Sequence, residues 1–258
     1  MGSTPKAPGP IHDPRKTTVA EGYDALGEDY AAWAAGILDA RDRMLQSFSV
    51  RLQPGSRVLD LGCGSGLPAT SVLALRFTVT GVDISAGQLE AARRNVPAAT
   101  FIQADMAGID FPAGSFDGVT AFYSILHVPR EEHGDLLGRV AHWLVPGGLL
   151  LATLGSADSP DWTGEWLGHP MFFSNHDAET NRRLVATAGF ELLVDEVIET
   201  VEPEGPVPFL WVLARRLPLA GAEAGESARG AAAGKARGQR SRGPRRSTVG
   251  NVAGYVAG

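Results

Sequence analysis

The residues of this 258-residue chain that are best suited to chemistry form a glycine-rich loop after a short apolar run. The segment Val58-Leu-Asp-Leu-Gly-Cys-Gly-Ser-Gly66 has glycines at three alternate positions, and glycine lets a backbone turn sharply beside a bound ligand. A second apolar run, Phe77–Val82, ends at Asp83. A carboxylate about 20 residues beyond such a loop suits the paired hydroxyls of a ribose. Loop and acid together predict a site for a nucleotide-like ligand.

The spacing within the loop distinguishes between ligands of this kind. Dinucleotide-binding loops read G-x-G-x-x-G, but here Leu67 stands where the third glycine of that pattern falls. An acid followed by G-x-G-x-G is the first motif of the class I S-adenosylmethionine-dependent methyltransferases, which the sequence resembles over residues 20–215. The resemblance implies S-adenosyl-L-methionine as cofactor. It also implies methyl transfer to O or N of a small-molecule acceptor, as in secondary metabolism.

The resemblance also assigns roles around the donor. Asp60 would orient the loop or the donor's ammonium group, the backbone of Gly62 and Gly64 would bind the methionine end, and Asp83 would hold the ribose. Each acid has a plain structural alternative as a turn or helix-entry residue, but acids at three successive strand ends favour a binding site. The predicted donor-binding residues are Tyr30, Asp60, Gly62, Cys63, Gly64, Asp83, Ile84 and Met106, with Asp105 for the adenine amino group and Phe122 and Tyr123 near the methionine.

His127 is the candidate catalytic residue, because it follows the fourth predicted strand, where the family borders both donor and acceptor. An imidazole with an ordinary pKa of about 6.5 suits a general base. The alternative is a histidine that only caps a loop or shapes the pocket, and methyl transfer can proceed largely by alignment of the reacting groups.

The acceptor is predicted to lie between the N-terminal helix and an aromatic segment at residues 155–176, which is expected to be irregular. Tyr23 and Tyr30 stand on one face of the helix, either as a lid over the donor or as an aromatic stripe packed on the core. The segment supplies aromatic walls with a few polar groups, which fit a partly apolar acceptor. The predicted acceptor-binding residues are Tyr23, Trp166, His169, Met171, Phe172 and His176, and no metal site is expected.

The order of predicted elements indicates an α/β fold. Strands at 58–61, 79–82, 100–103, 118–122 and 149–153 alternate with helices at 67–75, 85–95 and 131–143, and strands at 190–198 and 209–214 form an antiparallel pair. Such an alternation predicts a doubly wound, Rossmann-like, mostly parallel sheet of seven strands. The resemblance gives it the order 3-2-1-4-5-7-6, with helices on both faces.

Changes in composition along the chain set the predicted boundaries of the leader, the domain and the tail. Residues 1–18 are expected to form a disordered leader, and residues 19–216 the methyltransferase domain with its N-terminal helical lid. Residues 217–258 carry seven Lys or Arg and two Glu and, between 221 and 248, no large apolar side chain, so a disordered basic tail is expected. The single cysteine and the absence of a secretory signal or a long apolar run fit a cytoplasmic protein with no membrane partner.

Three other functions fit parts of the pattern. A nicotinamide-dependent oxidoreductase shares the strand, the glycine turn and the ribose acid, but not the spacing of the third glycine. A non-catalytic module would keep the fold and bind a partner. A nucleic-acid acceptor is disfavoured, because the body of the chain is acidic and Phe122-Tyr-Ser-Ile125 lacks the proline pair of the base methyltransferases. The sequence leaves the oligomeric state and transfer to carbon open.

Overall fold

The computed structural model describes residues 12–35, 40–202 and 205–218, which all belong to one compact unit. The predicted basic tail, apart from its first two residues, and residues 1–11 of the predicted leader lie outside this part of the chain. Within the described residues, no helix is long and apolar enough to cross a membrane.

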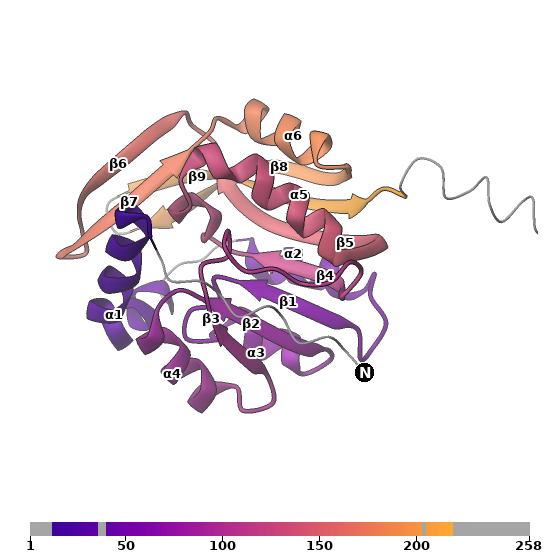
Figure 1. The fold of residues 1–258 in the computed structure, drawn as a ribbon, viewed down its shortest axis with the longest axis horizontal. Helices are drawn as coiled ribbons and strands as arrows, with labels where there is room; N and C mark the ends of the chain where they lie inside the picture. Colours follow the sequence, from indigo (N-terminus) through magenta and orange to yellow (C-terminus); the bar gives the residue numbers. More distant parts are fainter. Residues whose placement is uncertain (1–11, 36–39, 203–204, 219–258) are drawn as a thin grey trace, which may run out of the picture. The chain divides into compact units, whose positions relative to one another are not determined.

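A seven-stranded sheet forms the centre of the fold, in the order β3-β2-β1-β4-β5-β9-β8 (Figure 1). The first five strands are parallel, and β9 pairs antiparallel with both β5 and β8. This confirms the predicted order, because β8 and β9 are the sixth and seventh strands of the sheet. Its strands are β1 (Arg57–Leu61), β2 (Thr78–Asp83), β3 (Thr100–Gln103), β4 (Phe116–Ala121), β5 (Leu144–Gly155), β8 (Phe190–Glu202) and β9 (Gly205–Arg216).

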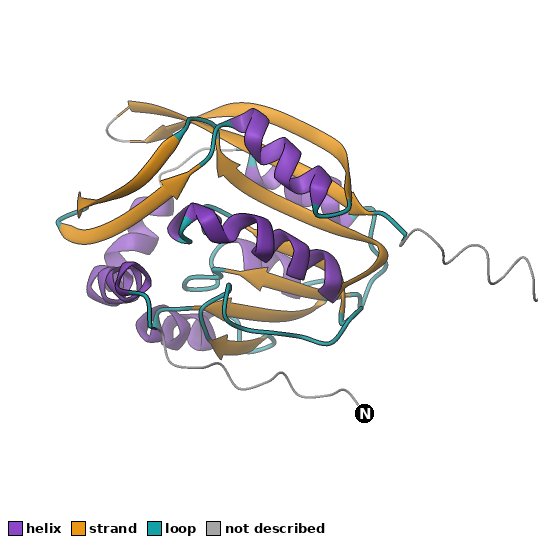
Figure 2. Cartoon of the chain, turned by 45° about the horizontal axis from the view of Figure 1, so that its top comes forward, coloured by secondary structure: helices purple, strands orange, loops and turns teal. Residues whose placement is uncertain are grey.

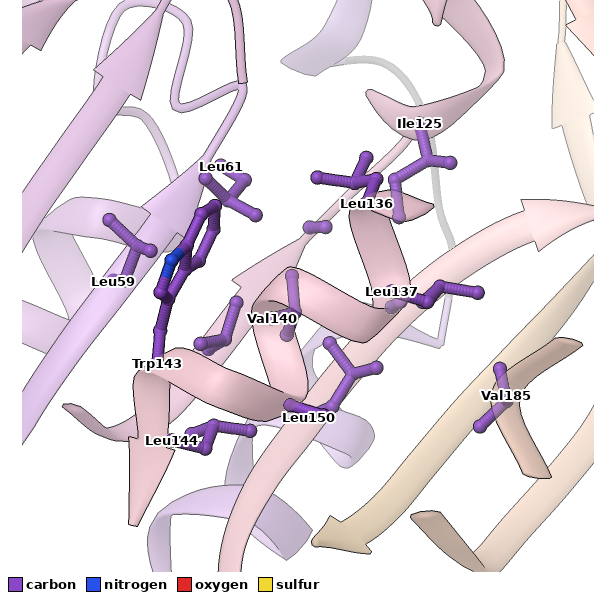
Figure 3. Packing of buried hydrophobic residues seen from close by; sticks show 14 of the residues in the cluster. Leu59, Leu61, Ile125, Leu136, Leu137, Val140, Trp143, Leu144, Leu150 and Val185 are labelled. Carbon is purple, nitrogen blue, oxygen red and sulfur yellow. The ribbon is translucent and has the colours of Figure 1, made fainter. Parts of the chain in front are cut away.

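Helices cover both faces of the sheet, because its central strands are apolar on both sides. On one face α5 (His133–Trp143) and α6 (Ala178–Thr187) lie over the strands (Figure 2). Trp143 of α5 packs beside Leu59 and Leu61 of β1 (Figure 3). On the other face α2 (Arg41–Ser49) and α3 (Ala69–Ala74) cover Val58.

Short-range hydrogen bonds and a glycine mark where two of the helices begin or end. The Ser85 hydroxyl accepts a hydrogen bond from the Gln88 backbone N–H, so Ser85 caps α4 (Ala86–Asn95). Asp177 caps α6 in the same way, on the backbone N–H of Thr180. Gly189 follows α6 with a φ of 93°, a conformation that glycine adopts without strain.

The N-terminal helix α1 (Pro14–Ala35) starts earlier than predicted, since residues 14–18 belong to it and not to a disordered leader. Its start is stabilised locally, because the Asp13 carboxylate accepts the backbone N–H of Arg15 and Pro14 suits a first turn. The helix breaks its regular geometry at Gly27, where φ is 51° and ψ is −127°. It packs along β7 and α4 (Figure 1).

The segment predicted to be irregular is instead a β-hairpin of β6 (Ser159–Trp166) and β7 (His169–Asn175), apart from the main sheet. Its two-residue turn has a positive φ at both Leu167 and Gly168, the pattern of a type I′ turn. The usual sequence signals for that turn are Asn-Gly and Asp-Gly. Because leucine occupies the first turn position, the sequence carries no recognisable signal for this hairpin.

Candidate active site

The glycine loop lies directly after β1, where its backbone faces a cavity. Gly62 and Gly64 have φ values of 70° and 53°, which favour glycine. A Cβ atom at Gly62 would overlap the Cβ atom of Ser124, so no larger residue fits there. The N–H of Gly64 donates to Asp83 Oδ2 at 2.8 Å, which joins the loop to the end of β2.

This donor cavity has an empty volume of about 640 Å³ and collects most of the residues predicted to bind the donor. It lies at the carboxyl ends of the strands, where open α/β sheets bind their ligands. Nine of the eleven predicted residues line it: Tyr30, Gly62, Gly64, Asp83, Ile84, Asp105, Met106, Phe122 and Tyr123.

Asp83 is a buried carboxylate on the wall of the donor cavity. Burial raises its pKa to about 6, although the backbone N–H groups of Ser85 and Gly64 partly offset that effect. Each carboxylate oxygen accepts one of these N–H groups and keeps a second acceptor site. Asp83 can therefore accept further hydrogen bonds from a ligand.

Gln88 of α4 offers a second buried acceptor that the sequence analysis did not identify. Its amide N–H group donates to the backbone oxygens of Tyr23 and Gly27, which fixes the side chain beneath α1. Its Oε1 atom is buried, has no hydrogen-bond partner and belongs to a residue that lines the donor cavity. A buried acceptor without a donor is costly, so this atom fits a ligand that brings hydroxyl or N–H groups.

Asp105 lies on the donor cavity wall together with a buried lysine from α1, Lys16. The Lys16 ammonium donates to Asp105 at 2.8 Å and to Glu132 at 2.6 Å. Burial by itself would lower the pKa of Lys16, but the two carboxylates outweigh burial and raise it. Lys16 therefore ties α1 to the cavity wall, a contact that sequence spacing does not reveal.

The structure does not bring Asp60 and Cys63 to the donor cavity. Asp60 is buried beneath the loop, where its carboxylate accepts the hydroxyl groups of Thr70 and Thr120 at 2.6 and 2.7 Å. This placement fits the predicted role in orienting the loop and not the contact with the donor's ammonium. The Cys63 thiol instead packs beside Gly81, and burial raises its pKa well above the usual range.

His127 is buried, and both of its ring nitrogens have hydrogen-bond partners. Its Nδ1 lies 2.8 Å from the backbone oxygen of Phe172, which can only accept, so Nδ1 carries a proton. Its Nε2 lies 2.9 Å from the Tyr23 hydroxyl. Burial lowers the pKa of His127 to about 4, so the imidazole is neutral near pH 7 and Nε2 is left as the basic atom.

A second cavity, the acceptor chamber, adjoins the donor cavity and has an empty volume of about 970 Å³. The two cavities have four lining residues in common, Tyr23, Tyr30, Tyr123 and His127. Among the described residues, these four side chains therefore mark the boundary between the two cavities. The dyad of His127 and Tyr23 stands at the place where two bound molecules would touch.

Two of the predicted acceptor residues, Tyr23 and Trp166, line the acceptor chamber, and the other four do not. Met171 and Phe172 are fully buried, because α1 covers β7. His169 stands at the hairpin turn, and His176 lies beyond β7 with its Nε2 3.1 Å from the backbone oxygen of Arg130. Met171 shares a face of β7 with Phe173, but it lies against Gly22 of α1, so the position of this helix keeps it out of the chamber.

The acceptor chamber also includes residues that were not predicted to bind the acceptor. Trp33 comes from α1, and Trp162, Phe173 and Asn175 come from the hairpin. The hairpin of β8 and β9 adds Glu202, Val207 and Phe209, while α2 adds Arg41. Trp162 and Phe173 stand out in the aromatic segment of the sequence, but the others are distant in sequence and carried no signal. Among the described residues, no three His, Cys, Asp or Glu side chains gather to hold a metal ion.

The parallel sheet, the glycine loop and the acids at strand ends define a Rossmann-like methyltransferase. A model of the methyltransferase domain family matches residues 58–148. The chain is 30% identical to an O-methyltransferase of Pyrenophora dematioidea over 86% of each chain, and 31% identical to the O-methyltransferase cnsE of Penicillium expansum over 75% of this chain and 79% of that one. The chain belongs to the class I S-adenosylmethionine-dependent methyltransferases.

Solved structures agree in fold. The 1,6-didemethyltoxoflavin-N1-methyltransferase of Burkholderia thailandensis, solved with its acceptor and S-adenosylhomocysteine, has a TM-score of 0.63 and 18% identity. That alignment covers 84% of this chain and all of the other. Because the chain belongs to this family, S-adenosyl-L-methionine is its cofactor, which excludes the nicotinamide alternative.

Proposed function

We propose that this enzyme transfers a methyl group from S-adenosyl-L-methionine to a hydroxyl oxygen of a small molecule, with His127 as the general base. The observation that carries this proposal is the position of His127 and Tyr23 on the wall between the donor cavity and the acceptor chamber. The names of the two fungal relatives, both O-methyltransferases, support oxygen as the acceptor atom.

The donor would lie in the donor cavity, held by groups that suit its chemistry. The Asp83 carboxylate and Gln88 Oε1 are acceptors for hydroxyl or N–H groups, and Asp105 is a further acceptor just beyond the carboxyl end of the neighbouring strand β3. When bound, the donor supplies an electrophilic methyl carbon, so that the acceptor oxygen bonds to this carbon while the carbon–sulfur bond breaks and sulfur keeps the electron pair.

His127 then accounts for the proton of the acceptor hydroxyl. Nδ1 is held by the Phe172 carbonyl, so the proton goes to Nε2, directly or through the Tyr23 hydroxyl. Burial raises the pKa of Tyr23 well above 10, which keeps its hydroxyl protonated and able to donate. The imidazole of His127 and the hydroxyl of Tyr23 are thus both uncharged before the reaction.

The lid helix α1 would exclude water from the reacting groups. It is attached to the body on two sides, by Lys16 at Asp105 and Glu132 and by Asp24, whose carboxylate accepts the Ser85 hydroxyl and the backbone N–H of Gly87. These contacts hold Tyr23 over the junction of the two cavities.

The choice of oxygen is tested with a donor that carries a deuterated methyl group and with acceptors matched in size, an aryl alcohol and the corresponding aryl amine. Mass spectrometry of the products should show the label on the hydroxyl compounds at a rate at least about tenfold above the amines, because loss of a proton to His127 makes the hydroxyl oxygen a stronger nucleophile, whereas a neutral aryl amine gains nothing from the base before it attacks. Preferential labelling of the amines would overturn the assignment to oxygen.

A further inference from the structure

We propose that the acceptor is a neutral, planar molecule of two or three fused rings with a phenolic or enolic hydroxyl on one edge. This inference rests on the proposed function and specifies its substrate class. The acceptor chamber carries the argument through its aromatic walls, its balanced charge and its unpaired neutral polar atoms.

Aromatic rings form most of the chamber wall, since eight of the fifteen described residues that line it are Phe, Tyr or Trp. Neighbouring rings are nearly perpendicular. The ring centres of Trp33 and Trp166 are 5.2 Å apart with an angle of 84° between their planes, and those of Trp166 and Phe173 are 5.6 Å apart with the same angle. Perpendicular walls of this kind let a flat molecule stack on one ring while the next ring meets its edge. A flat ring system gains both contacts, and a puckered or open-chain molecule gains neither fully.

The chamber charge favours a neutral molecule. Arg41 and Glu202 are the only lysine, arginine, aspartate or glutamate residues among the described lining residues, and their charges are opposite. The Arg41 guanidinium also lies 5.4 Å from the ring centre of Tyr123 and 5.8 Å from that of Phe122. A cation therefore already lies over these aromatic faces, which disfavours a second cation such as an ammonium acceptor.

Two buried polar atoms point to neutral oxygen or nitrogen substituents on the acceptor. Trp33 Nε1, a donor, and Asn175 Oδ1, an acceptor, have no hydrogen-bond partner, and both residues line the chamber. Neutral groups of this kind are satisfied by a carbonyl or ether oxygen and by a hydroxyl. A purely hydrocarbon ring system would leave both atoms without partners.

The hydroxyl is placed by the contact of His127 with Phe173, whose rings are tilted by 39° and have centres 4.7 Å apart. A flat molecule on Phe173 has one edge beside Nε2 of His127 and the Tyr23 hydroxyl. A hydroxyl on that edge can give its proton to Nε2 as its oxygen takes the methyl carbon from sulfur. A phenol or enol suits this weak base better than an aliphatic alcohol, because it releases its proton more readily.

The test measures binding, not turnover, with the enzyme first saturated with S-adenosylhomocysteine. The probes are 2-naphthol, its saturated counterpart decahydro-2-naphthol, the cation 2-naphthylmethylamine and the anion 2-naphthoate. Calorimetry should give 2-naphthol a dissociation constant at least about tenfold below those of the other three probes. Equal binding of the saturated alcohol, tighter binding of the cation or the anion, or no binding of 2-naphthol would overturn the substrate class.

Trp166 provides matched variants for the same measurement. Trp166→Leu should weaken 2-naphthol binding about tenfold, and Trp166→Phe, which keeps a ring, should stay within about threefold of the wild type. Both variants should keep the wild-type affinity for S-adenosylhomocysteine, which also shows that they fold. Unchanged naphthol binding in Trp166→Leu would contradict the aromatic wall. A wild-type enzyme that fails to bind S-adenosylhomocysteine would instead overturn the proposed function, and this inference with it.

Discussion

Replacement of His127 by glutamine is expected to lower kcat by about 10²–10⁴-fold, the usual contribution of a general base. Glutamine can still donate to the Phe172 carbonyl, but it has no basic nitrogen to receive the acceptor proton. The donor dissociation constant should stay within about threefold of the wild type, because the histidine is neutral near pH 7 and its loss removes no charge. Steady-state kinetics and donor calorimetry measure the two quantities separately.

Tyr23→Phe is the matched control for this prediction. It keeps the ring that packs on His127 and Tyr30 and removes only the hydroxyl bonded to Nε2. We expect a smaller loss of kcat than in His127→Gln, because Nε2 remains available to the acceptor. Wild-type turnover in His127→Gln would show that the enzyme works by alignment alone and would remove His127 as the base.

Asp83→Ala is expected to raise the donor dissociation constant by at least tenfold. A hydrogen bond to a charged group contributes about 1.5–3 kcal/mol, and about 1.4 kcal/mol corresponds to one factor of ten. The variant also loses the acceptor for the backbone N–H groups of Gly64 and Ser85, so the melting temperature must be measured beside the affinity. An unchanged dissociation constant in a folded variant would contradict the assignment of Asp83 to the donor.

The pH dependence of donor binding tests the same carboxylate without disturbing the fold. Burial raises the pKa of Asp83 to about 6, so the ionised, accepting form dominates above pH 6 and is lost as the pH falls below it. Donor affinity should then fall by about tenfold per pH unit below 6. Asp83→Asn, which cannot ionise, should flatten this dependence. A pH-independent affinity between pH 5 and 7 in the wild type would contradict the prediction.

Most of the residues predicted to bind the donor line a single cavity, because the determinants of that cavity are local. Alternate glycines after β1, an acid at the end of β2 and the serine cap of α4 each act within a few residues. A parallel sheet then brings the carboxyl ends of neighbouring strands together, so positions along the chain translate into one cavity. The exceptions, Asp60 and Cys63, show that adjacency to the loop does not decide whether a side chain points outward or inward.

The acceptor side was predicted poorly because it depends on contacts between distant elements. Met171 and Phe173 lie on the same face of β7, and the packing of α1 decides that Phe173 lines the chamber while Met171 is buried. A Cβ atom at Gly22 would come within 2.6 Å of the Pro170 oxygen, so this glycine permits the close approach of α1 to β7. No local pattern in the sequence encodes either fact.

The alternative of a non-catalytic module is disfavoured by the completeness of the site. The donor cavity keeps its acceptors, and the dyad of His127 and Tyr23 stands at the junction with an aromatic chamber. A module that only binds a partner has no need for a buried neutral base at that junction. The family shows the enzyme class. The donor cavity and the acceptor chamber are the sites that we propose for the methyl donor and the acceptor.

The most direct test of this two-cavity account is a structure of the enzyme with S-adenosylhomocysteine bound. We predict that its adenine lies by Asp105, its ribose hydroxyls by Asp83, and its sulfur toward the wall that carries His127 and Tyr23. The acceptor chamber should remain open beyond that wall. A ligand whose sulfur points away from His127, or whose adenosine occupies the chamber of Trp166, would contradict the account.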